Sequence, residues 1–89
     1  MKKKSHLEVV QLALEGLGWA TDRWGHMQVV APSGTVYRIK FQPISVRLER
    51  QMSFGAGNEW VKIDGDYLKD VKILEDGKVQ IGTHKLGKN

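Results

Sequence analysis

The segment TVYRIKFQPISVRL, residues 35–48, decides how this chain folds. Apolar and polar residues alternate along it, and alternate residues of a strand point to opposite faces of a sheet. Pro43 interrupts the alternation because it has no backbone N–H, so it predicts a bend or a sheet edge between two strands. The side chains expected to face the core are Tyr37, Ile39, Phe41, Ile44, Val46 and Leu48.

A helix is predicted before these strands. Ser5 and Glu8 have the spacing of a capping box, which satisfies free N–H groups of a first helical turn. A core-facing stripe follows at helical spacing and ends near a glycine pair: Leu7, Val10, Leu14 and Leu17. Val9 and Leu12 lie off this stripe. Either the sheet wraps far around the helix, which we favour, or these two residues contact a partner.

The remaining chain reads as short strands and turns. Strands are expected at 27–31 and 60–64, the second with Val61 and Ile63 facing inward, and a hairpin at 71–81 with its turn at Asp76-Gly77. A turn is predicted at Asp64-Gly65-Asp66, a flexible connection at 54–58, and fraying at 85–89. The expected fold is α+β: a single domain over 1–89, with a basic tail at 1–4 and one N-terminal helix packed on a curled antiparallel β-meander of about five to six strands.

Composition narrows the class of protein. The 89 residues suit one domain, and the absence of cysteine excludes disulfides and thiolate metal sites. The longest apolar runs are too short to cross a membrane, and no signal-peptide pattern follows the basic start. We therefore expect a cytoplasmic protein that does not insert into membranes. A net charge of +4 permits attraction to phosphate but does not require it.

Catalytic and metal-binding signatures are missing from the sequence. Gly55-Ala56-Gly57 lacks the other features of a phosphate-binding loop and fits a hairpin connection better. The carboxylates follow no metal-loop pattern, and the three histidines have no ligand spacing. We expect no metal and no cofactor, and a non-catalytic binding module is favoured over an enzyme.

One segment bears on this preference. Gly18-Trp19, then Arg23-Trp24-Gly25-His26, then Pro32-Ser33-Gly34 resembles in part the HicA family of mRNA interferase toxins. The resemblance covers residues 7–41 and implies a fold like double-stranded-RNA-binding domains, with His26 as catalytic base helped by Arg23. The sequence departs from the family in lacking the motif's serine beside His26 and the second helix. On the residues alone, His26 ends a loop and caps a strand, and Trp19 and Trp24 anchor a satellite of the core.

Strand alternation also predicts a basic surface. If the aliphatic residues of the strands face inward, several cations and one tryptophan share the opposite face: Arg38, Lys40, Arg47, Lys62 and Trp60. Cations that hold a phosphate backbone beside an aromatic that stacks on a base are typical of single-stranded nucleic-acid binders. Glu49 and Asp64 are expected on the same face and would weaken its potential. An ordinary solvated sheet face is the simpler interpretation.

Three functions follow as hypotheses. The first is a module that binds single-stranded nucleic acid through this basic face. The second is a protein-interaction or homodimerising accessory module of phage or mobile-element type, which buries Val9 and Leu12 or pairs through a sheet edge near Pro43. The third is a HicA-like ribonuclease that uses His26.

Overall fold

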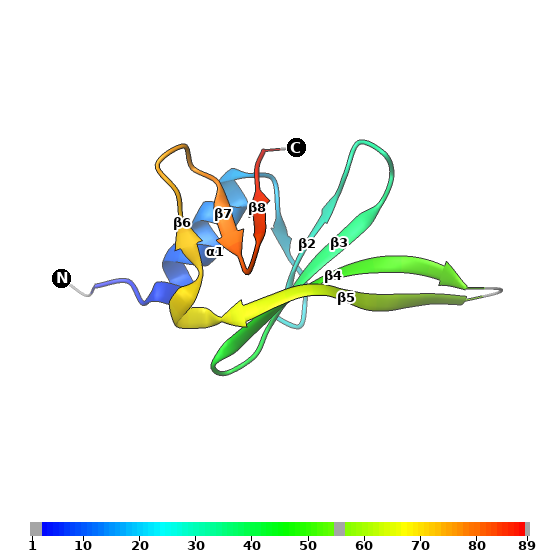
Figure 1. Ribbon diagram of the computed structural model, residues 1–89, viewed down its shortest axis with the longest axis horizontal. Coiled ribbons are helices and arrows are strands. Elements are labelled where there is room, and N and C mark those ends of the chain that lie inside the picture. Colours follow the sequence, from blue (N-terminus) through cyan, green and yellow to red (C-terminus); the bar gives the residue numbers. More distant parts are fainter. Residues whose placement is uncertain (1–2, 55–56, 89) are drawn as a thin grey trace.

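Helix α1 (His6–Gly16) begins where the capping pattern indicates. The Ser5 side chain accepts a hydrogen bond from the Glu8 N–H and donates one to the Glu8 carboxylate, at 3.2 and 3.4 Å. Val10 and Leu14 are fully buried, as the stripe predicts. The structure is a computed structural model that describes residues 3–54 and 57–88 (Figure 1).

Five strands form an antiparallel sheet in which each strand pairs with its neighbour in sequence. They are β1 (Ala20–Thr21), β2 (Met27–Val30), β3 (Val36–Phe41), β4 (Ser45–Phe54) and β5 (Gly57–Tyr67). Residues 55–56, inside the connection expected at 54–58, lie outside the described residues. The strands on either side of them pair up to Phe54 and Gly57, so β4 and β5 form one long hairpin.

Three shorter strands form a second antiparallel sheet after the 3-10 helix η1 (Leu68–Asp70). They are β6 (Lys72–Ile73), β7 (Val79–Ile81) and β8 (His84–Leu86). The expectation that 85–89 frays is therefore wrong for Lys85 and Leu86, which pair with β7. The α+β class with an N-terminal helix is confirmed, but the strands divide between two sheets.

One hydrophobic core joins the helix and both sheets. Its members are Val10, Leu14, Leu17, Trp19, Met27, Val29, Ile39, Val46, Leu48, Val71, Val79 and Ile81. Figure 1 shows α1 beside the small sheet at one end of the five-stranded sheet. The apolar face of that sheet is covered by α1 and by the second sheet together, not by the helix alone as the sequence suggested. We call this covered face the inner face and the opposite one the outer face.

Cross-strand register assigns side chains to these faces, because directly paired residues of antiparallel strands point the same way. Ile39 pairs with Leu48 and Phe41 with Val46, so the inner face is as predicted along β3 and β4. Ile44 is a correction: it lies in the turn before β4 and is 71% exposed.

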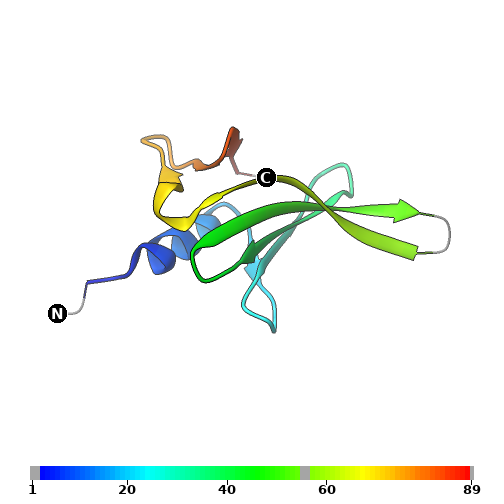
Figure 2. The same cartoon turned by 60° about the horizontal axis from the view of Figure 1, so that its bottom comes forward.

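Val61 and Ile63 are also exposed, which corrects the expectation that they are buried. Val61 pairs with Arg50, which follows Leu48 on the inner side, so its direction is as predicted. The β4–β5 hairpin extends away from the helix and the second sheet (Figures 1 and 2), in a molecule of 50 × 26 × 25 Å. The inner face therefore loses its cover where Val61 lies.

A β-bulge between Leu48 and Glu49 sets the direction of side chains on β5. Leu48 pairs with Asp64 and Glu49 with Lys62, so Ile63 is the extra residue. The turn predicted at 64–66 is wrong, since β5 continues to Tyr67. A Cβ on Gly65 would lie 3.1 Å from the Val46 carbonyl oxygen, so glycine serves close strand approach there.

Within residues 3–54 and 57–88, no helix is both long and apolar enough to span a membrane.

Candidate nucleic-acid interface

The register brings the five predicted residues onto the outer face. Arg38 and Lys40 lie on β3, opposite Glu49 and Arg47 of β4. Lys62 on β5 pairs with Glu49 from the other side, and Trp60 lies two residues before it. Strands β3, β4 and β5 thus present four cations and one indole on one surface.

Glu49 is the acidic centre of this face. Its side chain is buried, and Oε1 accepts hydrogen bonds from Arg38 Nε at 2.9 Å and Nη2 at 2.6 Å. Arg47 Nη2 lies 3.6 Å from Oε2 of the same carboxylate. A buried carboxylate shared by two guanidinium groups holds both in place and compensates part of their charge. The four cations of this face and Glu49 together carry a net charge of +3.

Arg38 also stacks on Trp60. Its Cζ lies 4.3 Å from the centre of the indole ring, within the range of a cation–π contact. Trp60 is half-buried as a result. The indole is therefore fixed in direction, and one of its two ring faces is occupied by Arg38.

Lys40 and Lys62 are the cations that Glu49 does not compensate. Neither takes part in an ion pair among the described residues. Beside Lys62 and Arg47 lies a hollow of about 430 Å³ that Tyr67 also lines. Tyr67 pairs with Ser45, which precedes the inward-facing Val46, so its ring belongs to the outer face, and it is 58% exposed.

Tyr67 is a residue that the sequence analysis missed. The predicted strand ended at Asp64, which left Tyr67 in a loop. If the strand is continued to residue 67 and the one extra residue of the bulge is counted, alternation places Tyr67 on the outer face. Asp64 was misplaced for a different reason, the bulge, which simple alternation does not include. The bulge turns it to the inner side, opposite Leu48, so it does not oppose the charge of the outer face.

The His26 side chain connects two strands of the sheet. Its Nδ1 accepts a hydrogen bond of 3.1 Å from the Phe41 N–H, which ties the start of β2 to the end of β3. Asp22 closes the preceding turn by accepting the N–H groups of Trp24 and His26 at 2.9 Å. Burial raises the pKa of Asp22, but these hydrogen bonds outweigh it and the net pKa is lowered.

The two tryptophans near this turn behave differently. Trp19 is buried in the core, as predicted, whereas Trp24 is 72% exposed and carries Arg23 at 5.3 Å from its ring, which corrects the prediction for Trp24. Strand β4, not a helix, follows β3, as the sequence indicated.

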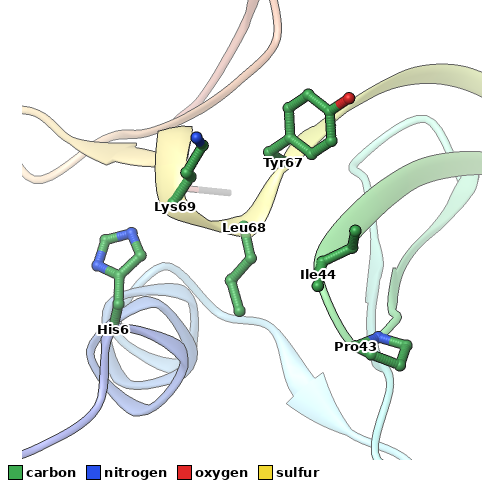
Figure 3. A pocket seen from close by; sticks show the side chains of 6 residues that line it. All are labelled: His6, Pro43, Ile44, Tyr67, Leu68 and Lys69. Carbon is green, nitrogen blue, oxygen red and sulfur yellow. The ribbon is translucent and has the colours of Figure 1, made fainter.

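The alternative partner surface is on the helix. Val9 and Leu12 are 37% and 47% exposed, so the favoured arrangement, in which the sheet wraps around the helix to cover them, is wrong. An apolar hollow of about 490 Å³ lies near the start of α1, between His6, the Pro43-Ile44 turn and Leu68, and Tyr67 lines both this hollow and the one beside Lys62. Figure 3 shows Leu68 pointing into the space between the helix and that turn.

Comparison with known proteins does not point to a function for this chain. No protein-family model, curated protein or solved structure matches this chain. In the part of the chain that the structure describes, no three His, Asp or Glu side chains gather closely enough to hold a metal ion. The outer face is the site at which charge, aromatic rings and open surface coincide.

Proposed function

We propose that this protein binds single-stranded nucleic acid through the outer face of its five-stranded sheet. The observation that carries the proposal is the shared direction of Arg38, Lys40, Arg47, Lys62 and Trp60, set by the register of β3, β4 and β5. Phosphates would lie along Lys40, Arg47 and Lys62, and bases would stack on the open face of Trp60 and on Tyr67.

Two details support this surface over an ordinary solvated face. Glu49 orders two arginines from beneath the surface, since its own side chain is almost completely buried. The four cations therefore outnumber Glu49 on this face, and Asp66 is the acidic residue that lines the hollow beside Lys62. The exposed Tyr67 supplies a second aromatic ring beside the hollow at Lys62.

Titration of fluorescently labelled single-stranded RNA and DNA at two salt concentrations tests the proposal. The unmodified protein is expected to bind at micromolar concentration and to weaken steeply with salt, because binding releases counterions from the phosphates. Lys40→Ala/Lys62→Ala should weaken binding at least tenfold without loss of stability, since neither lysine forms an ion pair within the described chain.

The matched control is Lys72→Ala/Lys78→Ala, which removes the same charge from β6 and from the turn before β7; the contact of Lys78 with Asp76, at 3.8 Å between two exposed side chains, adds little stability. It should bind nearly as tightly as the unmodified protein. If both double variants lose affinity equally, binding depends on net charge and not on this surface. If the unmodified protein does not bind at low salt, the proposal is wrong.

A second candidate, protein association through α1, is favoured by the exposure of Val9 and Leu12. A dimer that buries them should appear as a doubled mass in light scattering and revert to a monomer in Leu12→Glu. A monomeric mass for the unmodified chain removes the homodimer.

A further inference from the structure

A second site lies on the inner face, where the cover of the sheet ends. A pocket of about 420 Å³ is formed between the sheet and strand β8, and its floor is apolar, with Trp19, Leu48 and Leu86. It is separate from the surface discussed above, because Leu48 and Arg50 alternate with Arg47 and Glu49 along β4 and point the other way.

Two basic side chains, Arg50 and Lys85, are among the residues that line this pocket. His84 and Tyr37 also line it, and no Asp or Glu side chain of the described residues does. Neither Arg50 nor Lys85 belongs to an ion pair of the described residues. Two like charges that face one apolar cavity repel each other, and an anion between them would remove that cost.

Arg50 is the strongest indication of a ligand. The guanidinium emerges from a half-buried residue, and its Nε is buried without a hydrogen-bond partner among the described atoms. Arg47 Nε is also unpaired, but Arg47 has Glu49 beside it. A desolvated donor without an acceptor is costly, so Arg50 is poised for an oxyanion.

A contact with Asp64 holds the His84 ring in place at the pocket. Its Nδ1 lies 2.6 Å from Asp64 Oδ2, which leaves Nε2 as the ring nitrogen without this partner. The same carboxylate oxygen accepts the Thr83 N–H at 2.9 Å and the Thr83 hydroxyl at 3.1 Å. The wall of the pocket that β8 provides is therefore rigidly attached to β5.

We infer that this pocket binds a small organic oxyanion, a carboxylate or phosphate carried on an apolar body. Arg50 and Lys85 hold the oxygens, and the body lies against Trp19 and Leu48. Pockets that combine an apolar lining with a few convergent polar groups are typical of small-molecule sites.

Titration of the full chain with benzoate, hexanoate and phenyl phosphate, followed by two-dimensional NMR, tests this inference. At low-millimolar concentrations at least one anion should shift the Trp19 indole N–H and the amides of β8. Benzamide, which has the shape of benzoate without its charge, should not. A larger response to benzoate or to phenyl phosphate identifies the preferred head group.

Two arginines of β4 provide a matched pair of variants. Arg50→Gln should weaken binding of the anion at least tenfold, whereas Arg47→Gln on the outer face should leave it unchanged. Lys85→Gln, at an exposed position, provides a second variant with less risk to the fold and should weaken binding severalfold.

The inference is overturned if no anion binds, if benzamide binds as well as benzoate, or if Arg50→Gln and Lys85→Gln retain full affinity. Oligonucleotide binding should show the opposite pattern: Arg47→Gln should lower the affinity, and Arg50→Gln should leave it unchanged. Failure of one site is thus distinguishable from failure of the other.

Discussion

Asp64 Oδ2 lies 2.6 Å from His84 Nδ1, and this contact joins the last strand of the chain to the five-stranded sheet. The β-bulge beside Leu48 makes it possible, because it turns Asp64 away from the outer face and toward β8. One local irregularity thus removes an anion from the basic surface and provides an anchor for the inner pocket. The hydrogen bonds from His84 and from the Thr83 N–H hold the pKa of the Asp64 carboxyl far below its usual range.

Asp64 should make stability depend on pH in the acid range. A carboxyl with a lowered folded-state pKa contributes stability above its unfolded pKa of about 4, and this contribution is lost as pH falls through the folded-state pKa. Asp64→Asn should therefore be less stable than the unmodified protein at neutral pH, and the difference should shrink in acid. Urea unfolding across this range measures it, with the exposed Asp70→Asn as the control. A difference that is independent of pH would contradict the assignment.

Gly82 is expected to be the least replaceable glycine near this anchor. It has a φ of +58°, and a Cβ placed on it would collide with the Asp64 carboxylate. Gly77 has a φ of +88° with open space around it, so its replacement adds backbone strain alone. Gly82→Ala should lower the free energy of unfolding by about 1 kcal/mol or more beyond Gly77→Ala.

The excess cost at Gly82 should disappear when Asp64 is first replaced by alanine. Thermal and urea unfolding of the single and double variants make up the required cycle. If the two glycine variants have equal stability, no such close approach exists.

Glu49→Gln should separate stability from nucleic-acid affinity. Loss of the buried charge leaves Arg38 and Arg47 without their shared partner and should cost about 2 kcal/mol or more of folding stability. The outer face simultaneously gains positive charge, so oligonucleotide affinity should rise severalfold at low salt. Glu59→Gln, an exposed change on β5, controls for net charge. Reduced affinity in a folded Glu49→Gln protein would contradict the proposed surface.

Trp60→Leu should weaken binding of single strands by about 1–3 kcal/mol for each base that stacks on the indole. Trp24→Leu removes an equally large ring from the turn between β1 and β2 and should have little effect. Fluorescence anisotropy with the same oligonucleotide compares the two, after circular dichroism has shown that both variants are folded. Unchanged affinity for Trp60→Leu would exclude a stacking role.

The features that could be predicted from the sequence are those with a local cause. Alternation along β3 and β4 correctly placed Ile39 and Leu48 inside and Arg38 and Arg47 outside, because a period of two depends only on the backbone of each strand. The start of α1 followed in the same way from Ser5 and Glu8.

The errors have non-local causes. Asp64-Gly65-Asp66 has the composition of a turn, yet it continues β5 by pairing with β4, and its two carboxylates also accept hydrogen bonds from Thr83 and Gly82, far along the chain. The exposure of Val61 depends on how far α1 and the second sheet extend over the inner face, and short-range patterns carry no such information.

The three tryptophans provide the most direct measurement of the central claim, that strand register gathers a nucleic-acid surface on the outer face. Their indole N–H groups are followed by NMR while a single-stranded oligonucleotide is added. The indole signal of Trp60 should shift strongly, together with the amide signals of Lys40, Arg47 and Lys62. The indole signal of Trp19, which is buried beneath the inner face, should not change. A shift confined to Trp19, or an unchanged spectrum at saturating oligonucleotide, would contradict the claim.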